Sequence, residues 1–214
     1  MKPLIVPFFI SHKGCPHQCV FCNQVKIAGS GGDLPSAGEL LDRIAAYRAS
    51  GRRKSVEVAF YGGTFTSLPR PVLEQLLLPL QPLLSRGEVD SIRVSTRPDA
   101  VDAGIAEFLV QMGVRTVELG VQSMDDDVLT LSGRGHTAAH TLNACGILQA
   151  AGLAVGMQLM PGLPGDSEEK ALASLYGCLS LRPDFLRIYP TLVIVGTELA
   201  TLYDTGRYVP LSLD

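Results

Sequence analysis

The chain alternates short apolar runs with longer segments of helical periodicity over most of its 214 residues. The apolar runs are rich in Val, Ile, Leu and Phe and commonly end near Gly or Pro, which is typical of strands. Six strands are predicted, at residues 4–10, 55–61, 91–95, 116–121, 153–160 and 185–190.

The segments between these strands have the apolar spacing and the start signals of helices. Ser36, for example, is followed three residues later by Glu39, which is the pattern of a capping box. The predicted helices cover residues 36–50, 71–85, 102–113, 125–131, 137–151, 167–181 and 199–205.

Strand–helix alternation repeated six times predicts parallel strands joined by right-handed crossovers. An open doubly wound sheet and a barrel both satisfy this α/β pattern, and both build their sites where the strands end. Six units are too few for an eight-fold barrel, so we expect a partial (β/α)6 TIM-type barrel with parallel strands and a lateral opening. The length and the 46% hydrophobic content predict one domain over residues 1–214. The last seven residues resemble neither a helix end nor a tail, so the native chain is suspected to continue past Asp214.

The net charge of −3 and the pI near 5.8 do not indicate a strongly basic nucleic-acid surface, although a local patch stays possible. The N-terminal apolar run is short and interrupted by Pro7, which argues against a signal peptide or a membrane span. We therefore expect a cytoplasmic protein with no membrane partner. Cys145 and Cys178 lie on predicted helices among apolar neighbours, and buried inert thiols are expected there.

The other three cysteines, Cys15, Cys19 and Cys22, follow the first strand with the spacing C-x3-C-x2-C. Such short gaps place three thiolates around one centre, and thiolates favour soft metals and iron–sulfur clusters. A closed site normally has four protein ligands, and no fourth cysteine is nearby. His17 lies inside the loop and could be the fourth ligand, so zinc stays the alternative to a cluster.

Three ligands would leave one iron of a 4Fe-4S cluster open to a small molecule. With the aromatic Phe21 just before the last cysteine, the loop resembles the signature of radical S-adenosylmethionine enzymes. The resemblance implies that the open iron binds S-adenosylmethionine and that one electron cleaves it to a 5'-deoxyadenosyl radical, which abstracts hydrogen from a substrate. In such enzymes the cofactor carries the chemistry and the protein supplies placement and shielding.

Three further groups of polar or glycine residues follow predicted strands or lie in loops. Gly62, Gly63 and Thr64 either let a ligand approach the backbone or simply form a tight turn. The Gln122 amide suits ribose hydroxyls, or it faces water at a strand end. Arg134 could pair with a carboxylate in fork geometry, or it is a solvated loop residue.

The apolar stretch 157–165 breaks into Pro-Gly-Leu-Pro-Gly, where an adenine-sized ring could pack on backbone, or where the chain simply makes a rigid turn. Arg187 and Tyr189 alternate onto one face of the last strand, and we expect them on the substrate side of the barrel. His136 and His140 lack a nearby third ligand, so a polar loop residue and a helix-surface residue are predicted.

Together these residues resemble the radical S-adenosylmethionine domain of the elongator-complex catalytic subunit over essentially the whole chain, and oxygen-independent coproporphyrinogen III oxidases more distantly. The shared motifs are Cys-Pro-His-Gln-Cys at 15–19, Cys-Asn-Gln at 22–24, Tyr-Gly-Gly-Thr-Phe at 61–65, Ser-Thr-Arg-Pro-Asp at 95–99, Glu-Leu-Gly-Val-Gln-Ser at 118–123, Arg-Gly-His-Thr at 134–137, Met-Pro-Gly-Leu-Pro-Gly at 160–165 and Tyr-Pro-Thr-Leu-Val-Ile at 189–194.

The resemblance implies a role for each site residue. Cys15, Cys19 and Cys22 would hold the cluster. The cofactor's amino group would meet Gly62, Gly63 and Thr64, its ribose Gln122 and its carboxylate Arg134. The remaining pocket positions would be Ser95 and Gln158, with Phe21 near the adenine.

Two departures from the family pattern limit the functional prediction. Many relatives have Glu after the paired glycines, whereas this chain has Thr64, and the elongator-like branch also has Thr there. The sequence also has neither a basic N-terminal extension nor an acetyltransferase domain, so acetyl or carboxymethyl modification of tRNA is not supported.

We therefore expect an enzyme of unknown substrate that uses a 4Fe-4S cluster, S-adenosylmethionine and an electron donor such as flavodoxin or ferredoxin. The alternatives are a non-catalytic metal or Fe–S binding module, and the cofactor half of a larger, tRNA-modifying enzyme. The catalytic residues stay unknown at this level.

Overall fold

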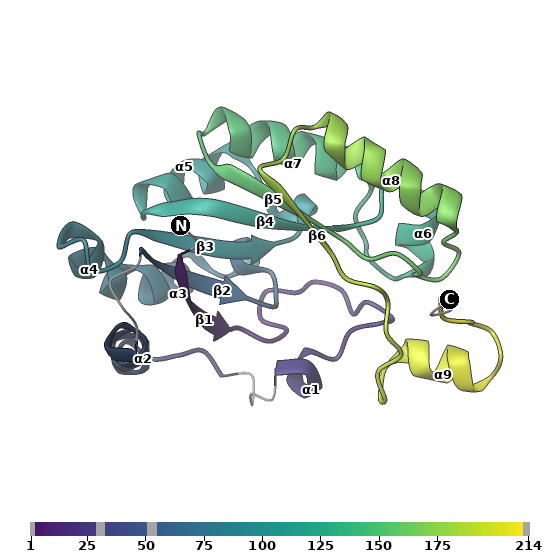
Figure 1. Cartoon of the computed structure of the whole chain (residues 1–214), viewed down its shortest axis with the longest axis horizontal. Helices are drawn as coiled ribbons and strands as arrows, with labels where there is room; N and C mark the ends of the chain where they lie inside the picture. The colour runs from purple at the N-terminus through teal and green to yellow at the C-terminus, as the bar shows by residue number, and fades with distance from the viewer. Residues whose placement is uncertain (1–2, 29–32, 51–54, 212–214) are drawn as a thin grey trace.

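The computed structural model describes residues 3–28, 33–50 and 55–211. Its centre is one six-stranded sheet in the order β1-β2-β3-β4-β5-β6, with every neighbouring pair parallel (Figure 1). The strands are β1 (Leu4–Phe9), β2 (Val56–Tyr61), β3 (Ser91–Thr96), β4 (Val114–Gln122), β5 (Ala154–Leu159) and β6 (Phe185–Ile188). Among these described strands β1 and β6 do not pair, so the curled sheet is a half-barrel with an open side. The predicted fold class is confirmed.

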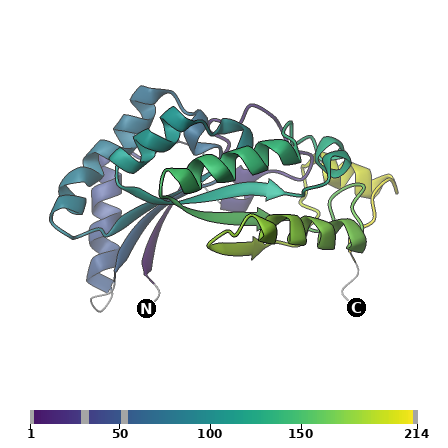
Figure 2. The same cartoon turned by 90° about the horizontal axis from the view of Figure 1, so that it is seen from above.

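The helices follow the strands in alternation and cover one face of the sheet, as Figure 2 shows from above. They are α1 (Gln24–Ala28), α2 (Ala37–Ser50), α3 (Arg70–Leu77), α4 (Gln81–Ser85), α5 (Ala103–Gln111), α6 (Asp126–Leu131), α7 (Ala138–Ala150), α8 (Glu168–Ser180) and α9 (Glu198–Asp204). In the part of the chain that the structure describes, none of these helices is both long and apolar enough to cross a membrane.

Two helix predictions need correction. The continuous helix predicted over 71–85 is interrupted, because a 3-10 turn over Leu78–Leu80 separates α3 from α4. Pro79 and Pro82 explain the break, since proline has no N–H to donate to the preceding turn. The short helix α1 was not predicted, because five residues next to the cysteine loop have too little periodicity to indicate a helix.

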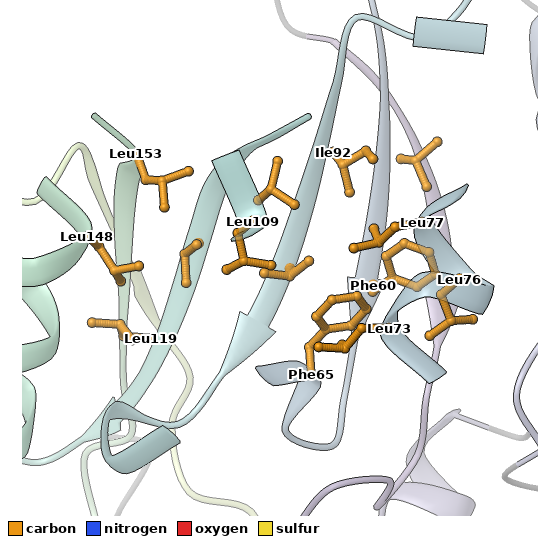
Figure 3. Packing of buried hydrophobic residues seen from close by; sticks show 14 of the residues in the cluster. Phe60, Phe65, Leu73, Leu76, Leu77, Ile92, Leu109, Leu119, Leu148 and Leu153 are labelled. Carbon is orange, nitrogen blue, oxygen red and sulfur yellow. The ribbon is translucent and has the colours of Figure 1, made fainter. Parts of the chain in front are cut away.

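Alternate strand residues face the helices and form the main hydrophobic core. Figure 3 shows part of this layer, in which Phe60 of β2 packs beside Phe65 with their ring centroids 5.1 Å apart. Ile92 and Leu119 continue the same layer on β3 and β4, and both are fully buried. Burying one such side chain contributes about 1.5–3 kcal/mol, so this face of the sheet determines the strand register.

The opposite, inner face of the sheet carries charged residues instead. Arg93 of β3 donates from Nη2 to Glu57 Oε2 on β2 at 2.7 Å, and from Nη1 to Glu118 Oε1 on β4 at 2.6 Å. Arg187 of β6 reaches the same Glu118 oxygen at 3.1 Å. Two carboxylates and two guanidinium groups thus neutralise one another inside the half-barrel, as buried charges must.

A glycine makes room for an aromatic ring on this inner face. A Cβ atom on Gly156 of β5 would lie 2.2 Å from the Phe185 ring of β6. The ring occupies the space that a side chain would need, and Arg93 lies over it at 5.1 Å. The Phe185 ring therefore fills the inner face beside Gly156, near the start of β6.

Candidate functional site

The cysteine loop runs from the end of β1 to α1 and lies at the carboxyl edge of the sheet (Figure 1). Backbone turns shape it: Cys15 N donates to His12 O at 3.2 Å, and Cys22 N donates to Cys19 O at 3.0 Å. Val20 N donates to Ser132 O at 3.1 Å, which ties the loop to the segment after α6. Cys19 is buried, whereas Cys15 and Cys22 are partly exposed.

Two of the three sulfur atoms contact side chains from the predicted cofactor positions. Thr64 Oγ1 lies 3.4 Å from Cys15 Sγ, and Thr64 is fully buried. Arg134 Nη1 donates to Cys19 Sγ at 3.3 Å, and its Nη2 donates to Gly120 O at 2.5 Å. The structure therefore brings together the cysteine loop, the segment after β2 and the segment after α6.

The thiol of Cys22, the third cysteine of the loop, has a raised pKa. Burial, together with the neighbouring charges of Cys19 and Cys15, raises the pKa of the Cys22 thiol to about 11. A hydrogen bond from Gln24 and the positive charge of Arg134 act in the opposite direction. Thiolates of one loop repel one another, and bound metal cations would reduce that repulsion.

Two features require glycine at both positions after β2: the backbone conformation and the closeness of neighbouring atoms. Gly62 and Gly63 have φ values of +74° and +61°, which favour glycine. A Cβ atom on Gly63 would lie 2.3 Å from Lys13 O, and one on Gly14 would lie 2.3 Å from Thr64 O. Thr64 N also donates to Lys13 O at 2.8 Å. The two loops pack backbone against backbone, so no side chain fits between them.

Gln122 ends β4 in a strained conformation. Its φ of +69° lies in the left-handed region, which costs a non-glycine residue about 1–2 kcal/mol. The pairing of β4 with β5 shifts register between Leu119 and Gln122. Gln158 Nε2 of β5 donates to Gln122 Oε1 at 3.1 Å, so the two predicted amides meet on the inner face. Strain of this kind is typical of functional sites.

The other two predicted pocket residues, Ser95 and Phe21, lie in different surroundings. Ser95 sits on the inner face of β3, in register with Glu118 of β4. Phe21 is buried in a second, smaller hydrophobic cluster with Leu199 and Tyr208. That cluster connects the cysteine loop to α9, so the C-terminal segment supports the loop. The roles predicted for Ser95 and Phe21 stay predictions.

His136 lies in a loop, as predicted, but it is buried rather than solvated. Its Nε2 lies 3.2 Å from Val121 O. Burial, with the positive charges of Arg134 and Arg97, lowers the pKa of His136 to about 3, against a smaller opposing effect of Asp99. The residue is therefore neutral at physiological pH.

A cavity of about 400 Å³ lies beside Gln122, between the end of β5 and α8. Gly162 of the Pro-Gly-Leu-Pro-Gly turn lines it, but a Cβ atom there would meet the Leu211 side chain at 2.7 Å. Gly165 similarly faces Leu131. In the described structure these glycines make room for side chains, and the expected packing of adenine on this turn stays a prediction.

Arg187 and Tyr189 meet at the mouth of the half-barrel. Arg187 Nη1 donates to Tyr189 Oη at 3.0 Å, and its guanidinium carbon lies 5.7 Å from the Tyr61 ring centroid. Tyr61 directly precedes the paired glycines. Arg187 and Tyr189 thus share one side of the strand, as predicted, and Arg187 lies beside Tyr61.

The donor set fits an iron–sulfur cluster by its chemistry. Three soft thiol donors come from one loop, and hydrogen-bond donors and one cation surround them, as is usual for cluster cysteines. Among the described residues, no three His, Cys, Asp or Glu side chains gather around a point where a single metal ion could bind.

Residues 9–175 match the profile of the radical SAM superfamily, and residues 183–214 match that of the radical SAM C-terminal domain. The chain belongs to the radical SAM superfamily. Members of the family bind a 4Fe-4S cluster and S-adenosylmethionine, which confirms the predicted cofactors. The family decides between cluster and zinc, which the cysteine spacing alone left open.

Two curated relatives match the radical SAM core. A tRNA uridine(34) acetyltransferase of Methanocaldococcus infernus is 38% identical over 120 residues, which is 55% of this chain and 22% of that protein. Elongator complex protein 3 of Saccharomyces cerevisiae is 33% identical over 173 residues, 72% of this chain and 31% of that protein. The matched parts thus make up less than a third of the length of either relative.

Solved structures show the same fold. The archaeal Elp3 of Methanocaldococcus infernus superposes with a TM-score of 0.73 at 23% identity, covering 99% of this chain and 51% of that one. Coproporphyrinogen III oxidase of Escherichia coli is more distant, with a TM-score of 0.62 at 21% identity over 90% of this chain and 44% of that one. The resemblance to the elongator subunit is confirmed by sequence and by fold, and the more distant resemblance to coproporphyrinogen III oxidase is confirmed at the level of the fold.

Sequence reasoning missed His12 and Gln24 as members of the site. Gln24 Oε1 accepts from His12 N at 2.5 Å and from Gly63 N at 2.8 Å. The motif Cys-Asn-Gln at 22–24 contained the signal, but without distances nothing separated Gln24 from its neighbours.

Proposed function

We propose that this protein is a radical S-adenosylmethionine enzyme in which Cys15, Cys19 and Cys22 hold a 4Fe-4S cluster. The observations that carry the proposal are the superfamily match over residues 9–175 and the contacts of Cys15 Sγ with Thr64 and of Cys19 Sγ with Arg134. When bound, the cluster supplies the electron that cleaves S-adenosylmethionine to methionine and a 5'-deoxyadenosyl radical, which abstracts hydrogen from the substrate. The protein's own task is to bind, orient and shield.

The residues at the carboxyl edge are proposed to bind S-adenosylmethionine. Gly62 and Gly63 leave backbone groups accessible beside the cysteine loop and, with Thr64, meet the amino group. Arg134 carries a positive charge next to Cys19 and suits the carboxylate. Gln122 binds the ribose through an amide that already contacts Gln158. Ser95 and Phe21 complete the pocket.

We propose that residues 1–214 act as one radical SAM core domain. The single sheet and the main hydrophobic core, which extends from β1 to α8, support this assignment. The substrate enters from the open side, where Arg187 of β6 donates to Tyr189. A small redox protein such as flavodoxin or ferredoxin supplies the electron.

The relatives favour a second, more specific function. Because two of them are named for tRNA uridine(34) acetylation and for the elongator complex, we propose that this core contributes to modification of a tRNA wobble uridine. Fluorescence anisotropy with labelled tRNA at low and high salt tests it. Salt-sensitive binding supports the function; no binding at low salt overturns it and leaves the substrate open.

Anaerobic reconstitution with iron and sulfide, followed by dithionite reduction, tests the main proposal. We expect 5'-deoxyadenosine and methionine from added S-adenosylmethionine, and neither product from Cys22→Ala. Cys145→Ala is the matched control, since it removes a buried thiol outside the cysteine loop. A fully loaded cluster that cleaves no S-adenosylmethionine would support the non-catalytic binding module instead.

A further inference from the structure

Gln122 is the central residue of a strained turn at the end of β4. Its φ is +69°, and Ser123 N donates to Val121 O across it at 2.9 Å. A positive φ bridged by a hydrogen bond between residues i and i+2 is the pattern of the rarer, strained form of the γ-turn. Such a conformation persists only where the surrounding structure holds it.

The loop that follows α6 supplies part of that support. His136 Nε2 lies 3.2 Å from Val121 O, and the ring nitrogen is the donor because a carbonyl oxygen only accepts. Two residues earlier, Arg134 Nη2 donates to Gly120 O at 2.5 Å. This loop thus bonds two successive carbonyls of β4, in the stretch where the pairing of β4 with β5 shifts register.

The other nitrogen of the His136 ring is buried without a use. His136 is 3% exposed, and its Nδ1 has no hydrogen-bond partner among the residues that the structure describes. Burial and the positive charges of Arg134 and Arg97 lower the pKa of His136 to about 3, so the ring is neutral and carries its one proton on Nε2. An apolar side chain would fill the space at lower cost. The bond to Val121 O is therefore what a histidine adds here.

Strand β5 fixes the same turn from its other side. Met160 N donates to Gln122 O at 2.9 Å, and Gln158 Nε2 donates to Gln122 Oε1 at 3.1 Å. Strand β5 thus binds the backbone and the side chain of Gln122, whereas His136 binds the carbonyl just before it. The peptide groups on both sides of Gln122 are held, so its amide starts from a fixed point on the inner face.

We propose that His136 is a positioning residue that holds the γ-turn at Gln122 through Val121 O, and so keeps the Gln122 amide in place for S-adenosylmethionine. The inference deepens the proposed function and rests on the ribose contact proposed there for Gln122. His136 does not contact the cofactor in this arrangement, and its whole effect on binding passes through Gln122.

A set of variants separates the hydrogen bond from the packing of the ring. His136→Leu fills a similar space without a donor, whereas His136→Gln places an amide N–H near the position of Nε2. Thr141→Val is the matched control, because Thr141 is also fully buried and its Oγ1 likewise has no partner in the described part of the chain. If His136→Leu does not fold, His136→Asn takes its place, because its shorter amide ends near the position of Nδ1.

The first readout is amide hydrogen exchange over residues 121–124 of the cluster-loaded protein, measured by mass spectrometry without added S-adenosylmethionine. The Ser123 N–H bonds within the turn, so its exchange reports how often the turn opens. We expect exchange about fivefold faster in His136→Leu than in the wild type and Thr141→Val, and near the wild-type rate in His136→Gln. Equal rates in His136→Leu and Thr141→Val would overturn the inference.

The second readout is the Kd of the same proteins for S-adenosylmethionine, measured at equilibrium without a reductant. We expect a Kd about fivefold higher in His136→Leu, but no further increase when His136→Leu is added to Gln122→Ala. Additive losses would overturn the inference, since they would show that His136 acts on the cofactor by another route. Faster exchange in His136→Leu, with a wild-type protein that binds no S-adenosylmethionine, would refute the proposed function and the cofactor role of the turn, while its support by His136 stands.

Discussion

Thr64 Oγ1 lies 3.4 Å from Cys15 Sγ, at a position that is fully buried. This contact gives a physical reason why an uncharged threonine, and not a glutamate, follows the paired glycines. A carboxylate beside the thiolates would bring another negative charge into a buried site, which is unfavourable without a compensating cation. A short hydroxyl fits the space and hydrogen-bonds the sulfur without adding charge.

Replacing Thr64 tests that contact. Thr64→Val keeps the shape and removes the hydroxyl, whereas Thr64→Ser keeps the hydroxyl. We expect Thr64→Val to release iron about tenfold faster than the wild type when challenged with a chelator, because partners of ligating atoms typically matter by that factor. Thr64→Ser should stay near the wild-type rate. Equal release rates in the two variants would contradict a role for the hydroxyl.

Gly63→Ala should be much more damaging than an alanine at a comparable glycine elsewhere. Gly63 and Gly87 have nearly equal φ values, +61° and +64°, but only Gly63 has backbone atoms within 3 Å of the point that a Cβ atom would occupy. We expect Gly87→Ala to lower the free energy of unfolding by about 1–2 kcal/mol, and Gly63→Ala by at least about 2 kcal/mol more. Chemical denaturation of the two proteins measures the difference; similar losses would show that the two loops can separate freely.

The inner-face charges make a prediction about stability. Glu118 accepts from Arg93 and Arg187, so Glu118→Gln leaves two cations with less compensation. We expect a loss of about 3 kcal/mol in the free energy of unfolding. Glu74→Gln is the control, because its pair with Arg70 is exposed and worth less than about 1 kcal/mol. If both substitutions cost the same, the inner network does not stabilise the half-barrel.

His136 predicts a pH dependence of stability. Its pKa is lowered to about 3 in the folded protein, from an ordinary value of 6.5. The unfolded chain therefore binds a proton that the folded one does not, and stability is lost as pH falls below about 6.5. His136 alone should make the free energy of unfolding fall by up to about 1.4 kcal/mol for each pH unit below that value.

Urea denaturation of the wild type and His136→Asn between pH 4 and pH 7 measures this slope. The variant should lose the His136 contribution, so its stability should vary less steeply with pH. His140→Asn is the comparison variant: it removes an exposed histidine of α7, and with it the hydrogen bond from Thr137 N to His140 Nδ1. Parallel curves for wild type and His136→Asn would show that other groups control the acid transition.

Much of this architecture could be predicted from periodicity alone. All six predicted strands are present, because runs of apolar residues buried against helices leave a clear signal. The continuous helix predicted over 71–85 was wrong. The leucine periodicity continues through Pro79 and Pro82, but the α-helical backbone is interrupted by a 3-10 turn there. The family could also be recognised from the order of its motifs, since the cysteine spacing and the glycine pairs are local features.

The contacts between loops could not be predicted in this way. His136 reads as a polar loop residue, and only the packed structure shows it buried against Val121. Gln24 and Gly63 are 39 positions apart, and nothing in either segment indicates a hydrogen bond between them. The meeting of Arg187 with Glu118 likewise depends on how strongly the sheet curls.

By itself, the sequence determined the order of strands and helices, the thiol loop and the family to which it belongs, because these depend on residue type and short spacing. Tertiary structure alone decided that Thr64 stands next to Cys15 and Arg134 next to Cys19, because these residues come from different segments. They converge because parallel strands place all their following loops at one edge of the sheet. The local sequence does not indicate that convergence, because it arises from burial of the apolar face of the sheet.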